Sequence, residues 1–65
     1  MKFLVYVVLG VYKDQRLMYS DLCHFTVDSP DEICYRVKEK ANEYHAINGP
    51  ECGVIPLSVS VCNAS

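Results

Sequence analysis

The chain of 65 residues contains no tryptophan and has only three glycines, three prolines and two histidines. Because Gly10, Gly49 and Gly53 are isolated from one another, the sequence has no glycine-rich loop of the kind that binds phosphate. The four cysteines include no C-x-x-C pair, and His24 and His45 are too far apart to act as a close pair of zinc ligands. We therefore expect neither a metal nor another cofactor.

Positive charge is also scarce. Lysine and arginine together number six, against eight aspartates and glutamates, which gives a formal net charge of −2 and an isoelectric point near 5.5. A nucleic-acid-binding domain of this size normally carries a basic stripe. The composition therefore indicates that the chain does not bind nucleic acid directly.

No hydrophobic run is long enough for a transmembrane helix, which needs about 20 apolar residues. The longest run, residues 3–12, lies between Lys2 and Lys13. It is rich in valine and tyrosine and lacks a small-x-small cleavage site, which is typical of a buried strand and not of a signal peptide. We expect a cytoplasmic protein with reduced thiols; the alternative is a secreted, disulfide-stapled peptide. Cys52 and Cys62 are expected to lie close enough to form a bridge.

Apolar residues nevertheless make up 51% of the chain. That fraction is far higher than in a disordered segment, so we expect one folded domain spanning residues 1–65. A domain this small buries only about 60% of the surface that its unfolded chain exposes. Because this leaves no enzyme-sized core, we expect a protein that is not an enzyme and that needs a partner.

Three segments are expected to form strands. Residues 2–12 and 17–27 are rich in valine, leucine, tyrosine and phenylalanine, which pack well on a pleated surface. Residues 54–62 alternate apolar and small side chains, and Pro56 indicates an edge strand. Residues 63–65 are expected to form a loose tail.

The first two strands are adjacent in the sequence, which predicts a hairpin. Asp14-Gln15 is not a preferred two-residue turn, so we expect a longer loop. The register is left open, with Gly10 beside either Tyr19 or Ser20.

A helix is expected at residues 30–47. Ser29 and Glu32 can form a capping box, with Pro30 at the first helical position. Gly49, which a proline follows, predicts the end of the helix. One apolar stripe recurs at helical spacing and consists of Ile33, Val37, Ala41 and Tyr44.

The order strand, strand, helix, strand predicts an α+β fold of the ββαβ type. Because the first strand is the most apolar, we place it in the middle of a three-stranded antiparallel sheet of order 2-1-3, with the helix packed on one face. The helix is expected to contact Phe3, Val5, Val7, Leu9 and Val11 of the first strand and Ile55, Leu57, Val59 and Val61 of the third.

The opposite face of the first strand holds Leu4, Tyr6, Val8, Gly10 and Tyr12. The sequence supplies no second layer to cover this face, and exposed apolar patches of several hundred Å² usually mark protein interfaces. We therefore expect an interface here. The alternative is a twisted sheet that leaves its tyrosine rings half exposed.

Residues suited to catalysis are few. Cys23 and His24 are neighbours on a strand and so point to opposite faces, which excludes them as a nucleophile and its base. On the helix, Tyr35, Lys38 and Asn42 follow one another at steps of three and four residues and share one flank. This flank is a candidate recognition surface; the alternative, which the spacing alone favours, is that the three residues occupy ordinary solvated positions.

Parts of the chain resemble the Dmd (discriminator of mRNA degradation) antitoxins of T-even-type bacteriophages. The similar segments are the run Val7-Val8-Leu9-Gly10-Val11-Tyr12-Lys13-Asp14, the pair Leu17-Met18 after a short turn, and the end of an acid-started helix at Ala41-Asn42. The resemblance covers roughly residues 3–43. Two helix positions matter in that family: an asparagine that aligns with Asn42 and a tryptophan that aligns with Ile33, where this chain departs from the family.

The resemblance implies a phage antitoxin in the cytoplasm of the infected bacterial host. It would bind an endoribonuclease toxin of the RnlA or LsoA type, occlude its RNA-binding groove and so protect phage mRNA. An acidic inhibitor also complements a basic groove. The alternative is a small structural module that forms a homodimer through its open sheet faces, without an inhibitory role. The expected toxin-binding residues are Ile33, Tyr35, Lys38 and Asn42 on the helix, with Tyr6, Tyr12 and Tyr19 as secondary anchors.

Overall fold

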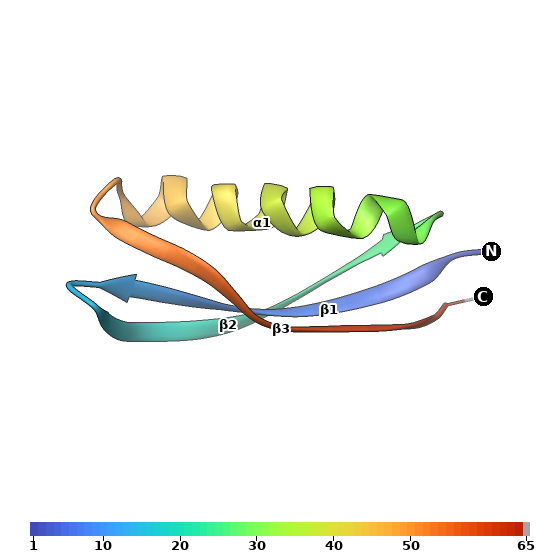
Figure 1. The fold of residues 1–65 in the computed structure, drawn as a ribbon, viewed down its shortest axis with the longest axis horizontal. Helices are drawn as coiled ribbons and strands as arrows, with labels where there is room; N and C mark the ends of the chain where they lie inside the picture. The colour runs from blue at the N-terminus through green and yellow to red at the C-terminus, as the bar shows by residue number, and fades with distance from the viewer. Residues whose placement is uncertain (65) are drawn as a thin grey trace.

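The computed structural model describes residues 1–64 as a three-stranded antiparallel sheet and one helix (Figure 1). The strand order is β2-β1-β3, so the most apolar strand is central and the predicted ββαβ fold of the α+β class is confirmed. The elements are β1 (Phe3–Lys13), β2 (Arg16–Val27), the 3-10 turn η1 (Pro30–Glu32), α1 (Ile33–Asn48) and β3 (Cys52–Asn63).

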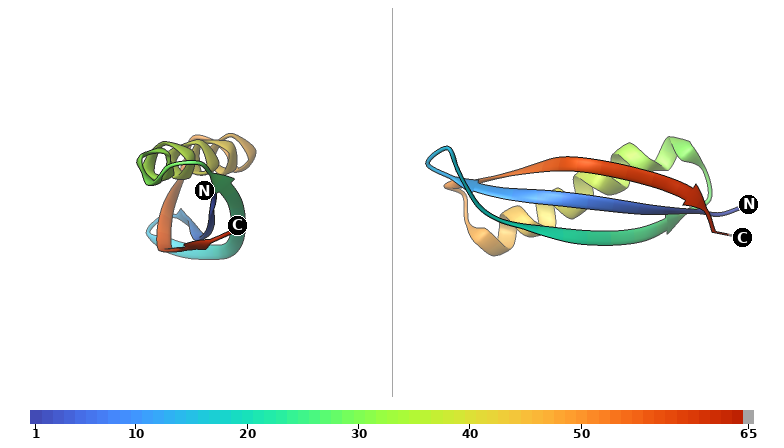
Figure 2. Two further views of the ribbon diagram at one scale, coloured as in Figure 1. Left: turned by 90° about the vertical axis from the view of Figure 1, so that its right-hand side faces the viewer. Right: turned by 90° about the horizontal axis from the view of Figure 1, so that it is seen from below.

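The sheet is strongly twisted and curls around one side of α1 (Figure 2). At the end of the sheet where both chain termini lie, β2 rises toward the start of α1 while β3 runs away from the helix (Figure 1). At the other end, β3 begins beside the end of α1. The molecule is elongated, measuring 41 × 15 × 15 Å. A single helix therefore covers β1 well but only parts of β2 and β3.

The hairpin between β1 and β2 closes through a two-residue turn, Asp14-Gln15. Both residues have positive φ angles, 53° and 64°, as the type I′ hairpin turn requires. The predicted longer loop is therefore wrong, because the match between this turn and the strand twist outweighs the low preference of these residues for positive φ. Past the turn, Met18 bulges out of the ladder, and Gly10 lies opposite Ser20, one of the two registers left open.

The start of the helical segment agrees with its sequence signals. The Glu32 carboxylate accepts hydrogen bonds from the backbone N–H groups of Asp28 at 3.0 Å and Ser29 at 2.9 Å. The Ser29 hydroxyl accepts from the N–H of Asp31 at 3.3 Å, and together these bonds form a capping box. The box satisfies N–H groups that the first turn of a helix leaves without partners. At the other end, Gly49 has a φ of 102° and closes α1.

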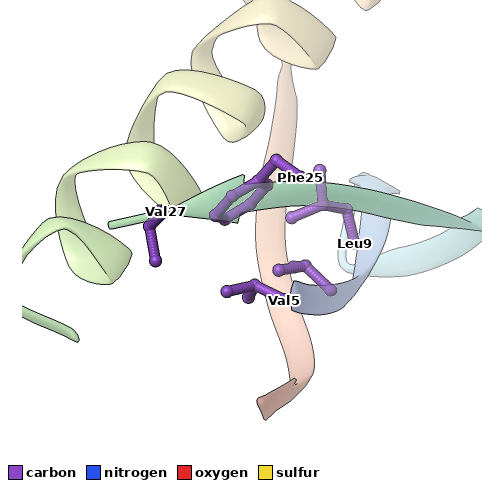
Figure 3. Packing of buried hydrophobic residues seen from close by; sticks show 5 residues of the cluster. Val5, Leu9, Phe25 and Val27 are labelled. Carbon is purple, nitrogen blue, oxygen red and sulfur yellow. The ribbon is translucent and has the colours of Figure 1, made fainter. Parts of the chain in front are cut away.

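The core lies between α1 and the odd-numbered side chains of β1 (Figure 3). Its buried residues are Val5, Val7, Leu9 and Val11 of β1 and Phe25 and Val27 of β2. The predicted helix stripe packs against the buried cluster while remaining partly exposed, as does Phe3. The stripe consists of Ile33, Val37, Ala41 and Tyr44, which confirms the helical spacing.

The third strand packs differently from its prediction. The ladder between β1 and β3 skips Leu57, which forms a β-bulge. One extra residue reverses which side chains point to which face. Ile55 therefore lies opposite Gly10, on the face away from the helix, and Val54 takes its expected place against the core.

Val59 and Val61 lie on the helix side, opposite Val7 and Val5. Each nevertheless remains 46% exposed, because β3 has diverged from α1 at this end of the sheet (Figure 1). None of the four β3 residues expected beneath the helix is buried, so that prediction is wrong. For Ile55 and Leu57 the prediction fails because of the bulge. For Val59 and Val61 it fails because the twist of the sheet carries β3 away from the helix.

All four cysteines are free thiols. Cys52 and Cys62 lie opposite Lys13 and Leu4, near the two ends of the same strand. At about 3.3 Å per strand residue, roughly 30 Å separates them. The predicted bridge between Cys52 and Cys62 is therefore wrong.

The end of the chain is more ordered than predicted. Asn63 is the last residue of β3, and the N–H of Ala64 donates to the carbonyl of Lys2 at 2.9 Å. Ser65, the last residue of the predicted tail, lies outside the described residues. Within the described part of the chain, no helix has the length and apolar character needed to cross a membrane.

Candidate functional site

The face of the sheet away from α1 is uncovered and is seen in the right-hand view of Figure 2, with the helix behind it. We call this surface the open face. Its side chains come from rows of paired residues across β2, β1 and β3. The rows are Thr26-Leu4-Cys62, His24-Tyr6-Ser60, Leu22-Val8-Ser58, Ser20-Gly10-Ile55 and Leu17-Tyr12-Gly53, and Leu57 adds its side chain at the bulge.

The open face combines large apolar groups with a lack of charge. Leu22 is 61% exposed, Ile55 51% and Leu57 45%. None of the described residues in its five rows is an aspartate, glutamate, lysine or arginine. Charge depletion and aromatic enrichment distinguish the centre of a protein interface from ordinary surface. The open face therefore has the composition of a contact surface.

Gly10 leaves space at the centre of the open face, and two large side chains occupy it. A Cβ atom at this position would lie 2.9 Å from Leu57 Cδ1 and 3.1 Å from Tyr12 Cε1. Both side chains occupy space that any other residue at position 10 would need. Further along β1, the ring of Tyr6 lies beside that of His24, with 6.1 Å between centroids. Tyr6 and Tyr12, both predicted anchors, thus belong to this one surface.

The predicted helix contacts lie on a second surface. Tyr35, Lys38 and Asn42 are all exposed, and Tyr35 is the most accessible tyrosine among the exposed large side chains, at 66%. Ile33 is different, because it is partly buried and packs against the core. The structure therefore brings three of the four helix candidates together on the outer side of α1 and assigns Ile33 to the core packing.

Tyr19 does not belong to the open face. It lies opposite Val11, on the helix side of β2. Its hydroxyl accepts a hydrogen bond from Asn48 Nδ2 at 2.8 Å, and it lies 3.2 Å from Asn48 Oδ1, to which it can donate. Tyr19 thus holds the end of α1 against β2 and is separated from Tyr6 and Tyr12 by the thickness of the sheet.

Sequence reasoning missed a polar network between β2 and α1. The Cys23 thiol donates to the Tyr44 hydroxyl at 3.3 Å, and that hydroxyl donates to the Asp21 carboxylate at 2.5 Å. Asn48 Nδ2 also donates to the Tyr44 carbonyl at 2.8 Å. The signal available in the sequence was the alternation of β2, which places Tyr19, Asp21 and Cys23 on one face.

The chemistry of this network favours a structural role. The hydrogen bond to Asp21, followed by the bond from Cys23, raises the pKa of Tyr44 above its ordinary value. The Tyr44 phenol therefore keeps its proton and stays neutral, and a neutral phenol is a poor base. The Cys23 thiol uses its proton as a donor, whereas a nucleophilic cysteine needs a base to remove that proton. The network therefore positions α1 on β2.

The described residues form no detected pocket and no group of three or more metal-ligating side chains. Comparison of the chain with known protein families, with curated proteins and with solved structures finds no match. Two exposed surfaces carry predicted contact residues: the open face with Tyr6 and Tyr12, and the outer side of α1 with Tyr35, Lys38 and Asn42.

Proposed function

We propose that the chain is a non-enzymatic phage antitoxin. It binds an endoribonuclease toxin of the RnlA or LsoA type in the cytoplasm of the infected bacterial host. By occluding the RNA-binding groove of the toxin, it inhibits cleavage and protects phage mRNA. The resemblance of residues 3–43 to the Dmd antitoxins names this partner.

One structural observation carries the proposal beyond the resemblance. The open face spans all three strands, is rich in apolar side chains and has no formal charge in its five rows. Leaving such a surface in water is costly for a domain with a small core, and a partner that covers it recovers that free energy. An inhibitor that acts by steric occlusion needs contact area of this kind and no catalytic groups.

Charge supports the same partner. The net charge of −2 leaves the molecule weakly acidic, and a groove that binds RNA is expected to be basic. Complementary potentials increase the rate of association and disfavour wrong partners. The apolar open face would then supply the contact area, and the net negative charge of the whole molecule the attraction.

Co-purification with RnlA and LsoA tests the proposal. The tagged chain is expected to retain at least one toxin and to stop its RNA cleavage in vitro. The substitution Leu22→Lys, in the middle of the open face, is expected to weaken binding at least tenfold, because a lysine would be buried unpaired in an apolar contact. Ile47→Lys is the matched control, since Ile47 is a similar side chain, 78% exposed on α1.

Failure of both toxins to bind the unmodified chain would reject the proposal. Equal loss of binding in the two lysine variants would reject the open face as the contact surface. The same open face also fits the alternative of a homodimerising module with no inhibitory role. That alternative predicts a stable dimer in solution and no effect on either toxin.

A further inference from the structure

The second half of β3 is an unprotected sheet edge. Among the described residues, no strand pairs with the outer side of β3. An edge strand presents alternate N–H and C=O groups without partners, and proteins usually block such edges with charge, proline or bulges. In β3 the proline and the bulge, Pro56 and Leu57, both lie in the first half. Residues 58–63, Ser-Val-Ser-Val-Cys-Asn, contain neither and carry no charge.

The first half of the other sheet edge is protected. β2 carries Arg16 and Asp21 and bulges at Met18. The Asp21 side chain also accepts a hydrogen bond from the backbone N–H of Leu22 at 3.1 Å, which occupies one of the N–H groups of this strand. The second half of β2, residues 22–27, carries no formal charge and no bulge, but there the Arg36 guanidinium donates to the carbonyl of Thr26 at 3.5 Å. Among the described residues, no side chain makes such a contact with the backbone of residues 58–63.

Apolar side chains accompany this edge. Val59 and Val61 point to the helix side of the sheet, where α1 no longer covers them, and each is 46% exposed. Ser58, Ser60 and Cys62 point to the open face. The segment is therefore small and polar on one face and apolar on the other.

We propose that β3 pairs antiparallel with β3 of a second copy of the chain, about a two-fold axis through Ser60. In this register Val59 of each copy lies opposite Val61 of the other, and Ser60 lies opposite its own equivalent. Facing residues in an antiparallel pair must share a face, and this register satisfies that condition throughout. The two sheets become one six-stranded sheet.

The occupant is a second copy because the segment is self-complementary. The sequence Ser-Val-Ser-Val-Cys has the same order of small polar and apolar side chains in both directions around Ser60, and the two valine pairs cover each other. No charge on the segment selects a partner of opposite sign. The pairing uses the strand edge and leaves the open face and the outer side of α1 free, so it is separate from the proposed toxin contact.

Sedimentation equilibrium of the full chain tests this pairing. The mass is expected to rise from one chain toward two between about 1 µM and about 1 mM, the range of a modest interface. Ser60→Lys would place like charges opposite each other at the axis, and we expect it to weaken dimerisation at least tenfold. Ser20→Lys puts the same side chain on the same face at the β2 edge and is expected to dimerise as the parent does. Far-UV circular dichroism checks that both variants fold.

Hydrogen exchange distinguishes edge pairing from face pairing. In a dimer joined through β3, the outward N–H groups among residues 58–62 are expected to exchange at least tenfold more slowly at high than at low protein concentration. A monomer at every concentration would overturn the proposal. So would a dimer that resists Ser60→Lys, or one in which these N–H groups gain no protection. Val59→Lys changes a residue on the helix side of β3, outside the open face, and would bring a lysine opposite Val61 of the second copy. This variant is expected to lose dimerisation and to retain the toxin, which keeps the result independent of the proposed function.

Discussion

The Tyr44 hydroxyl is one of the points at which β2 and α1 are joined by polar contacts, in addition to the Tyr19–Asn48 pair. It donates to the Asp21 carboxylate and accepts from the Cys23 thiol, so one phenol satisfies two groups on the same strand. A hydrogen bond between a neutral donor and a carboxylate is stronger than one between two neutral groups. The helix is thereby fixed to β2 by polar contacts, in addition to the packing of its apolar stripe against the core that includes Phe25 and Val27.

Removal of this hydroxyl in Tyr44→Phe is expected to lower the free energy of unfolding by about 1 kcal/mol at pH 8, the typical net value of such a bond. The raised pKa of Tyr44 in the folded protein means that the unfolded chain ionises first as pH rises. The stabilisation is therefore complete below the ordinary phenol pKa of about 10 and is lost as pH rises above it.

Urea denaturation of both proteins at pH 8 and near pH 11 measures this difference. The gap between parent and variant is expected to shrink at the higher pH. Tyr35→Phe is the control, because Tyr35 is 66% exposed. A gap that grows with pH, or an equal effect of the two substitutions, would contradict the role of Tyr44.

Asn42 is the residue through which the family resemblance can be tested on the helix. Its side chain is exposed on α1, so Asn42→Ala is expected to leave stability within about 0.5 kcal/mol of the parent. The resemblance aligns this position with an asparagine that matters in the Dmd family, on a surface separate from the open face, so inhibition of the toxin is expected to fall at least tenfold. RNA-cleavage assays with increasing amounts of antitoxin measure the effect, and Asn63→Ala, at the end of β3, is the matched control. Undiminished inhibition by Asn42→Ala would remove this position from the proposed contact.

Among the elements, the junction between α1 and β3 depends on a backbone conformation. Gly49 has a φ of 102°, which residues with a side chain rarely adopt. Gly49→Ala is expected to lower the free energy of unfolding by about 1–2 kcal/mol. Gly53 is the second residue of β3. Its φ angle is not positive, and no atom lies within 4 Å of the place where a Cβ would be. Gly53→Ala is therefore expected to be neutral or slightly stabilising, and thermal denaturation compares the two variants.

The elements themselves were predictable because each carries a local signal. The capping box at Ser29 and Glu32 and the helix stop at Gly49 depend on neighbouring residues only. The faces of β3 were not predictable, because the apolar residues alternate without interruption through Leu57. The bulge there is decided by pairing with β1, where Gly10 leaves the space that the Leu57 side chain occupies. That constraint comes from Gly10, which lies 47 positions before Leu57 in the sequence (57 − 10 = 47).

The candidate surfaces were predictable from local patterns, whereas contacts that depend on strand register were not. The open face followed from the alternation of β1, and the helix surface from its spacing of three and four residues. Tyr19 was predicted as an anchor in addition to Tyr6 and Tyr12, and the structure places it on the opposite face of the sheet from them. That position depends on the register of the hairpin, which could not be read from the sequence. The Tyr44 network depends on that same register.

For the molecule as a whole, the core is small enough that one buried residue contributes a large share of the stability. A chain of 65 residues is expected to have a free energy of unfolding of about 3–10 kcal/mol. Leu9 is fully buried, and Leu9→Ala is expected to cost about 2–5 kcal/mol. Far-UV circular dichroism with increasing urea is thus expected to place the unfolding midpoint of this variant well below that of the parent. Leu22→Ala removes the same atoms from an exposed site and should remain folded; equal losses would contradict the assignment of the core.

The bond between Ala64 and Lys2 brings the two ends of the described chain together at one end of the sheet. A short linker could join them, and the Asp14-Gln15 turn could be cut to provide new termini. In such a circular permutant, β3 and β1 would become a hairpin, while β1 and β2 would pair from opposite ends of the chain. Contacts close in sequence form fastest. Which of the two hairpins forms first would thus be set by where the chain is cut, with the sheet itself unchanged.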